Sequence, residues 1–385
     1  MGGRSLKLVF FSNYYTHHQK AISEQFDLRT NHEYAFVSTE DFAQERLDLG
    51  WTDEKRKFVV RHDAATSAEM IKNAENIIFG SAPRALLDLC LKQKKRVFFY
   101  SERVFGKGYC FLKWPARVIR FWLRYGRHQN LYLLCASAYT AADYAMHLSC
   151  LRRTYRWGYF TETMHYDLGA LMKEKNRTKI LWCGRLIDWK CPNDVLTVAK
   201  RLKEAHYDFE IDFIGSGVLE SQLKEQIQRD GLTHCVKLLG AMTPQQVRNH
   251  MEKAGIYLFT SNFQEGWGAV LNESMNSGCA VVASHAIGSV PFLLNHGENG
   301  LVYKSGDIES LYVKVKYLLD HPDEQIRLGT NAYDTIVNLW NADVASERFL
   351  KLTEEIKERG CCDLYEEGPC SRAPILWNSW FEETK

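Results

Sequence analysis

Two glutamates, eight positions apart, lie in the stretch of the sequence that is best suited to bind an anionic ligand. Glu265 belongs to a polar turn with Gly266, Trp267 and Gly268, and Glu273 lies about one turn into the helix expected to follow. The N–H groups at a helix start attract anions, because the aligned peptide dipoles are worth roughly half a positive charge. The two carboxylates are therefore candidates to face a sugar and a ribose, on either side of a diphosphate. Acidic residues near a helix start also stabilise it without a ligand, so a purely structural interpretation stays open.

The turn that carries Glu265 is predicted to lie inside a strand–helix–strand unit. The apolar run Ile256–Thr260 predicts a buried strand, and the run Cys279–Ala283 predicts a second one. Gly278 ends the helix between them, since glycine adopts the left-handed conformation at low cost. In such a unit the helix begins at the carboxyl end of the first strand, where open α/β sheets bind ligands.

A second group of candidate residues follows the predicted strand Lys179–Cys183. Gly184 lets the chain turn close to a ligand. Arg185 offers a planar fork that holds two phosphate oxygens at once, and Lys190 adds a compact point charge. These residue types are common on surfaces, so the pattern is weak by itself.

Two further loops end neighbouring predicted strands. Gly215 follows the strand at 210–214, and Ala241 and Met242 follow the strand at 236–239. A phosphate can approach the backbone at the first loop, and a base can rest against the second. Because the carboxyl ends of parallel strands meet at one edge of a sheet, we expect all these loops to converge on the turn at Glu265.

The first half of the chain alternates short strands with helical stretches, which predicts a parallel sheet covered on both faces. The expected strands are 6–11, 34–38, 57–61, 76–79, 96–100 and 131–134. Polar residues follow four of them: Ser12-Asn13-Tyr14 with His17 and His18, then Gly80-Ser81, Ser101-Glu102-Arg103 and Ser137. Ligand binding and plain capping or turn roles are both compatible with these residues.

The strand–helix alternation restarts after the polar run at 173–177, which predicts a domain boundary. We expect one domain at 1–165, a second at 166–343, and a C-terminal helix with a tail at 344–385. The helix is expected to pack back on the first domain. Trp377, Trp380 and Phe381 of the tail are expected to pack as well, with the first domain as the favoured partner.

The segment from Arg103 to Asn130 combines seven basic residues with aromatic ones and contains no acidic residue. Its arginines recur at three- and four-residue spacing, so they are predicted to line one face of a helix. The residues of this predicted surface are Arg117, Arg120, Arg124 and Arg127, with Trp114 and Trp122 among them. An anionic membrane surface, a solvated structural helix and, less favoured, nucleic acid are the alternatives.

Composition narrows the class of protein. The net charge is only +2, yet residues 1–165 carry 25 basic and 16 acidic side chains while residues 166–385 carry 24 and 31. This asymmetry indicates that the first half faces an anionic partner. No apolar run approaches the roughly 18 residues of a membrane span, and the N-terminal stretch lacks the pattern of a signal peptide. The eleven cysteines show no metal-ligand spacing, so reduced thiols, a cytoplasmic location and no metal are expected.

With its loops in this order, the sequence resembles the retaining glycosyltransferases of family 4. These enzymes have the GT-B architecture, in which two Rossmann-like, doubly wound α/β domains face each other across a cleft. The matching residues are Gly184-Arg185-Leu186 with Lys190, Ile214-Gly215-Ser216-Gly217, the pair Glu265 and Glu273 in EGWGAVLNE, and Gly278 with Ala280–Ser284. The first half matches in layout only.

The resemblance implies a role for each matching residue. Arg185 and Lys190 bind the diphosphate of a nucleotide sugar, Glu273 the ribose hydroxyls and Glu265 the transferred sugar. Further donor contacts are implied at Gly184, Gly215, Ala241, Met242, Gly266, Trp267, Gly268, Ala269 and Val270. The acceptor is expected on the first domain. There the loop after the first strand lacks the glycine pair of many relatives, so His17 and His18 are assigned to the acceptor instead.

The resemblance also implies the reaction. A sugar passes with retention from a nucleotide-diphosphate sugar, UDP being favoured over GDP, to a glycan or polyprenyl-linked acceptor in surface polysaccharide biosynthesis. Glu265, Arg185, Lys190 and Glu102 are the catalytic candidates, and no metal or other cofactor is expected. The protein is expected in the cytoplasm, with peripheral contact to the inner face of the cell membrane. A sugar-nucleotide epimerase of the same architecture and a non-catalytic nucleotide-sugar binder are the alternatives.

Overall fold

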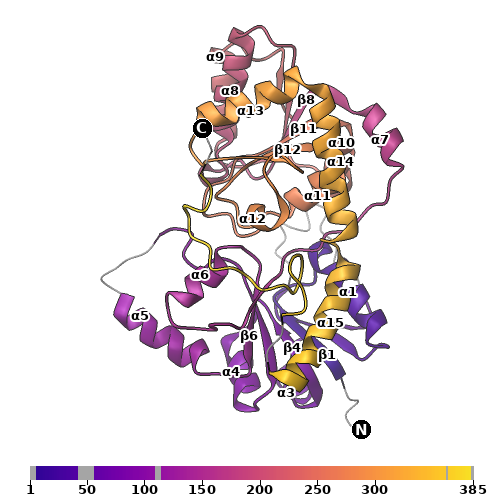
Figure 1. The fold of residues 1–385 in the computed structure, drawn as a ribbon, viewed down its shortest axis with the longest axis vertical. Helices are drawn as coiled ribbons and strands as arrows, with labels where there is room; N and C mark the ends of the chain where they lie inside the picture. The colour runs from indigo at the N-terminus through magenta and orange to yellow at the C-terminus, as the bar shows by residue number, and fades with distance from the viewer. Residues whose placement is uncertain (1–5, 42–55, 109–113, 361–362, 383–385) are drawn as a thin grey trace. The chain divides into compact units, whose positions relative to one another are not determined.

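The chain forms two α/β units in a computed structural model (Figure 1). The structure describes residues 6–41, 56–108, 114–360 and 363–382. Unit 1 comprises Met1–Glu162 and Trp340–Trp377, and unit 2 comprises Thr163–Leu339 and Asn378–Lys385. The division after Glu162 lies near the boundary that we placed after residue 165, and the segment at 344–385 is shared between the units rather than separate.

Unit 1 contains, among its described residues, a seven-stranded parallel sheet in the order β3-β2-β1-β4-β5-β6-β7. The strands are β1 (Leu6–Ser12), β2 (Tyr34–Ser38), β3 (Val59–Arg61), β4 (Ala74–Phe79), β5 (Arg96–Ser101), β6 (Leu131–Cys135) and β7 (Thr154–Arg156). The helices are α1 (His17–Arg29), α3 (Ala64–Asn73), α4 (Arg84–Lys92), α5 (Trp114–Phe121), the π-helix η2 (Trp122–Gly126), α6 (Thr140–Ala145) and α15 (Ala342–Arg359). Six of these strands were predicted; β7, three residues in a basic stretch, was not.

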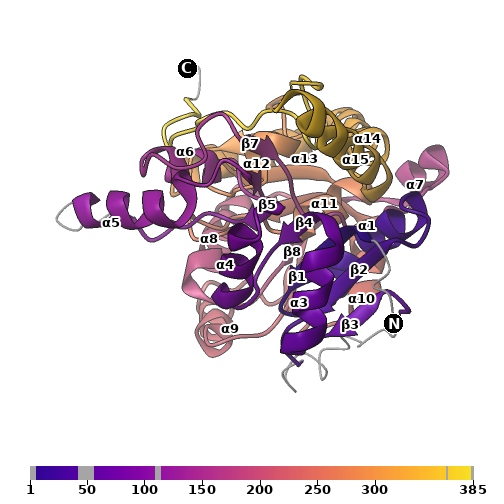
Figure 2. The same ribbon diagram turned by 90° about the horizontal axis from the view of Figure 1, so that it is seen from below.

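Helices cover both faces of this sheet (Figures 1 and 2). The alternation of side chains along β5 shows the two sides, because Phe98 contacts Phe349 of α15 while Phe99 contacts Tyr125 of η2. Phe349 also packs edge-on against Phe26 of α1, with ring centroids 5.4 Å apart. The C-terminal helix α15 therefore packs on the first unit, as predicted.

Unit 2 contains, within the described part of the chain, a six-stranded parallel sheet in the order β10-β9-β8-β11-β12-β13. Its strands are β8 (Asn176–Cys183), β9 (Glu210–Ile214), β10 (Val236–Leu238), β11 (Ala254–Phe259), β12 (Ala280–Ser284) and β13 (Leu301–Tyr303). Its helices are α7 (Leu168–Glu174), the 3-10 helix η3 (Asp188–Lys190), α8 (Pro192–Glu204), α9 (Glu220–Arg229), α10 (Pro244–Lys253), α11 (Val270–Asn276), α12 (Val290–Leu293), α13 (Ile308–Asp320) and α14 (Pro322–Asn338). All six strands were predicted, within three residues at each end.

The core of unit 2 follows the two-residue period of its strands. Ile180 and Trp182 of β8 point to the same side as Ile256 and Leu258 of β11, and all four belong to one buried cluster with α8. Burial on both faces explains why these strands read as continuous apolar runs. The strand order of each sheet reverses beside its first strand, which fixes where the polar loops gather.

The end of the tail does not pack where we predicted. Trp380 donates its indole N–H to the carbonyl of His285 at 3.2 Å, and the Phe381 ring lies 5.5 Å from that of His296, so both aromatic residues pack on unit 2. Trp377 is half exposed. None of the helices that the structure describes is long and apolar enough to cross a membrane.

The contact of α15 with unit 1 is testable through Phe349, which is fully buried between Phe26 and Phe98. Phe349→Ala leaves a cavity, so we expect it to lower the free energy of unfolding by about 3–5 kcal/mol. Urea unfolding measures the change, with Glu354→Ala on the exposed side of the same helix as the matched control. Equal stabilities of the two variants would contradict this packing.

Candidate functional site

The strand order of unit 2 reverses between β8 and β11, and the loops that follow these two strands flank this point. Open α/β sheets bind ligands in the crevice at such a reversal, outside the carboxyl ends of the strands. The loop after β8 carries Arg185 and Lys190, and the loop after β11 carries Glu265. Three of the predicted site residues therefore meet at the one edge of the sheet where a ligand is expected.

Lys190 and Glu265 form an ion pair across this reversal, and their side chains are only 11% and 9% exposed. The Ser261 hydroxyl donates a second hydrogen bond to the same Glu265 oxygen at 2.8 Å. The ammonium of Lys190 lies 4.7 Å from the centre of the Trp189 ring, and the guanidinium carbon of Arg185 lies 5.6 Å from it. One indole thus gathers both cations beside the glutamate, a favourable setting for an anion.

The turns after β8, β9 and β10 form one layer. The N–H of Gly184 donates to the carbonyl of Ile214 at 3.0 Å, and the N–H of Gly215 donates to the carbonyl of Gly240 at 2.8 Å. Gly215 has a φ of +136°, and a Cβ there would lie 1.9 Å from the Gly184 oxygen, so only glycine fits. The predicted convergence of these loops is a feature of the structure.

Ala241 and Met242 directly follow Gly240 in this layer. Ala241 is exposed and Met242 half-buried, so both are accessible at the edge of the sheet. Their contact with the base of a nucleotide stays a prediction.

The turn between Glu265 and α11 is held rigidly. Trp267 is fully buried, its indole N–H donates to Asn272 at 2.8 Å, and its carbonyl accepts from Ser289 at 2.6 Å. Gly268 has a φ of +80° and lies against the Phe259 ring. The Trp267 side chain is therefore buried away from any ligand, so the predicted donor contacts at Gly266, Trp267, Ala269 and Val270 concern their backbone. Because α11 has only seven residues, the positive charge at this edge comes chiefly from Arg185 and Lys190.

Glu273 lies in the first turn of α11, and burial raises the pKa of its carboxyl to about 7, against the lowering influence of Arg248. The charge of Glu273 in turn raises the pKa of the Cys183 thiol, after the larger effect of burial. Glu273 is thus near the end of β8, on the same edge as Lys190 and Glu265. A carboxyl with a pKa near neutrality is a common property of functional sites.

Unit 1 has a polar pocket of about 580 Å³ at the carboxyl ends of β1, β4 and β5, beside its own reversal of strand order. The predicted residues that line it are Ser12, Asn13, Tyr14, His18, Gly80, Ser81, Ser101, Glu102 and Arg103. The His17 ring lies beside that of His18, with centroids 4.0 Å apart and planes tilted by 48°, but His17 is not among the lining residues. Ser137 is fully buried.

Several residues of this pocket were missed in the sequence. They are Thr16, Gln19, Phe99, Tyr100, Val104 and Tyr159. Tyr159 follows β7, the strand that we did not predict. Had β7 been recognised, the position of Tyr159 just after a strand of this sheet would have indicated it. Its hydroxyl donates to the Glu102 carboxylate at 2.7 Å.

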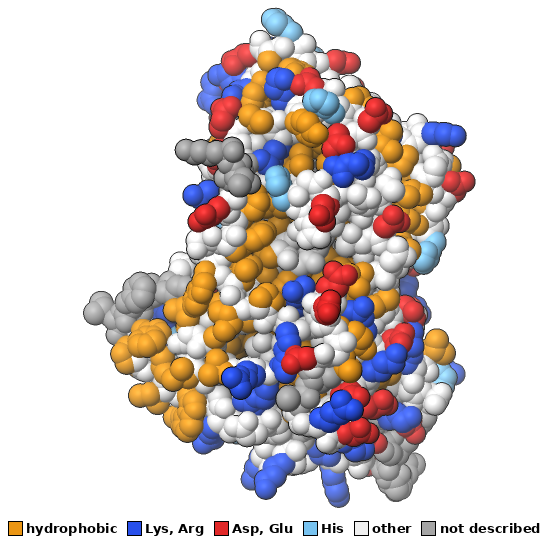
Figure 3. All heavy atoms as spheres, in the orientation of Figure 1, with side chains coloured by type: hydrophobic (Ala, Val, Ile, Leu, Met, Phe, Trp, Pro, Cys, Tyr) orange, Lys and Arg blue, Asp and Glu red, His pale blue; other side chains and the backbone are white. Residues whose placement is uncertain are grey.

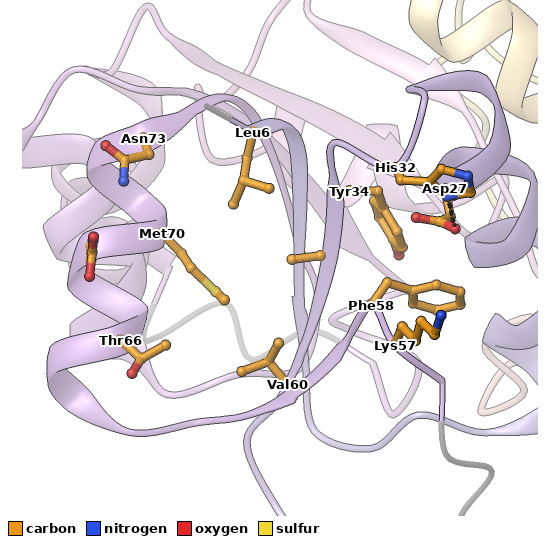
Figure 4. A pocket seen from close by; sticks show the side chains of 12 residues that line it. Leu6, Asp27, His32, Tyr34, Lys57, Phe58, Val60, Thr66, Met70 and Asn73 are labelled. Atoms are coloured by element: carbon orange, nitrogen blue, oxygen red, sulfur yellow. Dashed lines mark hydrogen bonds and ion pairs between the residues drawn. The ribbon is translucent and has the colours of Figure 1, made fainter. Parts of the chain in front are cut away.

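A second pocket of unit 1, of about 530 Å³, lies at the opposite end of the sheet (Figure 4). Leu6 and Tyr34, which begin β1 and β2, line it together with side chains of β3 and α3. Figure 4 shows Met70 of α3 on one side of the strands and the Phe58 ring on the other, next to Tyr34 and Lys57. It contains no predicted site residue and lies away from the edge at which such sheets bind ligands.

The basic, aromatic segment forms an outward-facing surface. Phe121 and Tyr125 point inward, where both contact Tyr144. The outward apolar side chains are Trp114, Ile119, Trp122 and Leu123, which are 42%, 61%, 47% and 45% exposed. Figure 3 shows apolar side chains gathered in this region, next to basic ones.

The sequence predicted that the arginines line one face of a single helix, and the structure corrects this prediction. The α-helical spacing ends at Phe121, because Trp122–Gly126 form a π-helix, which shifts the phase of Arg124 and Arg127 relative to the residues before it. Arg117 is partly buried over the Phe105 ring, whereas Arg120 and Arg124 are exposed. Lys113, another basic residue of the predicted segment, lies outside the described residues.

Comparison with known families concerns mainly unit 2. Residues 169–335 match the family model of glycosyl transferases group 1. The amylovoran biosynthesis glycosyltransferase AmsK of Erwinia amylovora is 27% identical over 183 residues, which are 46% of this chain and 45% of that protein. The chain thus aligns with less than half the length of this curated relative.

Solved structures resemble both units. Anabaena Alr3699/HepE in complex with UDP has a TM-score of 0.68 at 14% identity, covering 91% of this chain and 100% of that one. A glycosyltransferase from Rickettsia africae ESF-5 has a TM-score of 0.67 at 14% identity, covering 92% and 100%. At these identities the likeness concerns the fold. The chain therefore has the GT-B fold of two parallel-sheet α/β units, and its residues 169–335 are similar to the group 1 glycosyl transferases.

Proposed function

We propose that the protein transfers a sugar, with retention, from a nucleotide-diphosphate sugar to a glycan or polyprenyl-linked acceptor in surface polysaccharide biosynthesis. The observation that carries this proposal is the pair of cations, Arg185 and Lys190, gathered on Trp189 beside Glu265 where the strand order reverses. The family match of residues 169–335 supports transfer over the epimerase and the non-catalytic binder. HepE, solved with UDP, supports UDP as the nucleotide.

The proposed role of each residue follows from where negative charge develops during the reaction. When the anomeric bond breaks, the departing diphosphate gains charge opposite an oxocarbenium-like sugar, and donors fixed at that place are the largest catalytic lever. Arg185 and Lys190 are assigned to the diphosphate, Glu273 to the ribose and Glu265 to the sugar. Because Glu265 is held by Lys190 and Ser261, we assign it to orienting the sugar rather than to attacking it. The acceptor then attacks on the face that the diphosphate leaves, and a donor phosphate oxygen takes its proton.

We further propose that the surface of α5 and η2 contacts an anionic membrane, which places the protein on the inner face of the cell membrane. Arg120 and Arg124 supply positive charge beside the exposed apolar residues Trp114, Ile119 and Trp122. Amphipathic segments of this composition lie in the membrane interface, and each basic residue near it contributes about 1 kcal/mol.

Removing one cation tests the nucleotide site. Hydrogen bonds to charged groups are worth about 1.5–3 kcal/mol, so Arg185→Ala and Lys190→Ala should each weaken UDP binding about 10- to 100-fold. Titration calorimetry with UDP and GDP measures the affinities, and a panel of radiolabelled nucleotide sugars measures turnover. Arg201→Ala, on an exposed ion pair of the same unit, is the matched control. A wild-type protein that neither binds nor turns over any of these nucleotides would refute the enzyme assignment.

The pKa of Glu273 predicts how UDP affinity depends on pH. Burial raises this pKa to about 7, so the carboxylate that accepts the ribose hydroxyls is mostly protonated at pH 6 and mostly ionised at pH 8. We expect UDP binding to strengthen about tenfold between these values. Glu273→Gln should remove that part of the profile, and the slope that remains reports the phosphate of UDP itself. Identical profiles for the two proteins would contradict the role of Glu273.

Liposome flotation tests the membrane surface. Replacing Arg117, Arg120 and Arg124 by Glu reverses three charges, so we expect binding to vesicles with one-third phosphatidylserine to fall at least about 100-fold. Lys72, Lys92 and Lys94, exposed basic residues elsewhere on unit 1, are replaced by Glu as the matched control. Undiminished flotation of the triple arginine variant would remove this surface from the proposal.

A further inference from the structure

The polar pocket of unit 1 has an aromatic wall. The rings of Tyr159 and His18 stack with centroids 5.7 Å apart and planes 18° apart, and Tyr100 meets Tyr159 at 84°. Tyr14 and Phe99 complete the aromatic lining. Burial, followed by the charges of Tyr159 and Glu102, raises the pKa of Tyr100 well above its usual value, so this tyrosine is uncharged at neutral pH. Flat rings beside a few fixed polar groups suit a ligand that has an apolar C–H face and hydroxyl edges, as a pyranose has.

One carboxylate of this pocket is fixed in place. Glu102 directly follows β5, and the Tyr159 hydroxyl donates to its carboxylate at 2.7 Å. The Ser101 hydroxyl donates to the Glu102 carbonyl at 2.9 Å, which holds the backbone of the same residue. A carboxylate accepts hydrogen bonds at about four positions and donates none, so it suits ligands that carry hydroxyl groups. Glu102 is therefore suited to ligands that donate hydrogen bonds.

The positive charge of Arg103, the residue after Glu102, is directed toward Asp143. Arg103 lies 4.0 Å from the Asp143 carboxylate, with both side chains at most 5% exposed, and its guanidinium carbon lies 4.7 Å from the centre of the Tyr139 ring. Asp143 also accepts the N–H groups of Val104 and Phe105 at 2.8 and 3.0 Å. The loop after Glu102 is thus anchored with its arginine turned to Asp143. Electrostatically, the pocket presents a carboxylate to its ligand, which disfavours uronates and phosphates.

We propose that this pocket binds an uncharged sugar ring, with Tyr159 as the stacking residue and Glu102 as the residue that selects against acidic sugars. Its identification as the place of the acceptor's terminal sugar rests on the proposed function. Glu102, a catalytic candidate from the sequence, then determines which acceptor is used. In this proposal, unit 2 binds the anionic nucleotide and unit 1 binds the neutral sugar.

Saturation-transfer-difference NMR on the full chain without nucleotide tests the pocket directly. The probes are methyl α-D-glucopyranoside and methyl α-D-galactopyranoside, with methyl α-D-glucuronide as the acidic counterpart of the first. We expect at least one neutral probe to bind, and the glucuronide to bind at least about tenfold more weakly than the glucoside. Glu102→Gln should reduce that ratio to about threefold or less, because it removes the charge and keeps the shape.

Two tyrosine variants separate stacking from folding. Tyr159→Leu should weaken binding of the neutral probe at least about tenfold, whereas Tyr159→Phe keeps the ring and should stay within about threefold of the wild type. Tyr317→Leu, on an exposed face of α13, is the matched control, and circular dichroism checks the fold of each variant. Equal losses in Tyr159→Leu and Tyr159→Phe would overturn the stacking role.

The wild-type protein distinguishes failure of this inference from failure of the proposed function. Binding of UDP without binding of either neutral glycoside, or equal binding of glucoside and glucuronide, overturns the sugar pocket alone. Binding of a neutral glycoside without binding of UDP or GDP supports the pocket and refutes the nucleotide-sugar transferase.

Discussion

The ion pair between Lys190 and Glu265 connects the two loops at which the sheet of unit 2 changes direction. Its side chains are nearly buried, and taking two charges out of water costs more than a surface pair returns. The pair persists because the surroundings hold it: the Thr260 hydroxyl donates to the carbonyl of Lys190 at 2.8 Å, and the Trp182 indole donates to Thr260 at 2.9 Å. The pair is thus fixed from both strands, at the edge where such sheets bind ligands.

Strand order is what brings these loops together. In each unit the chain adds strands on one side of its first strand, then returns and adds strands on the other side. β1 and β8 therefore each lie next to a strand that is distant in sequence. Right-handed crossovers place the helices of the two directions on opposite faces, which leaves a crevice at the carboxyl ends where the direction changes. The polar loops of both units gather there, around Glu102 in one and around Lys190 in the other.

The two edges nevertheless differ in charge, and the difference lies in how each arginine is engaged. Arg185 is exposed against Trp189, next to a lysine, so its charge is available at the edge of the sheet. Arg103 is buried against Asp143, so its charge anchors a loop instead. The same architecture thus carries cations at one edge and a carboxylate at the other, without any change of fold.

Strands and polar loops of this protein follow from its sequence, because burial on both faces of a parallel sheet requires continuous apolar runs and the loops between them are short. The runs at β8, β11 and β12 and the glycines at 184 and 215 are local signals, and the family resemblance added roles for the residues between them. Three features needed the folded chain. Strand β7 has only three residues and forms by pairing with β6, so the sequence did not reveal it or the Tyr159 that follows it. The π-helix at Trp122–Gly126 changed which arginines share a face of the basic surface. The partner of the Arg103 charge is Asp143, which lies forty positions away in the sequence. The periodicity of strands and helices can be recognised from neighbouring residues, whereas the partner of a charged side chain is determined by residues that meet only after folding.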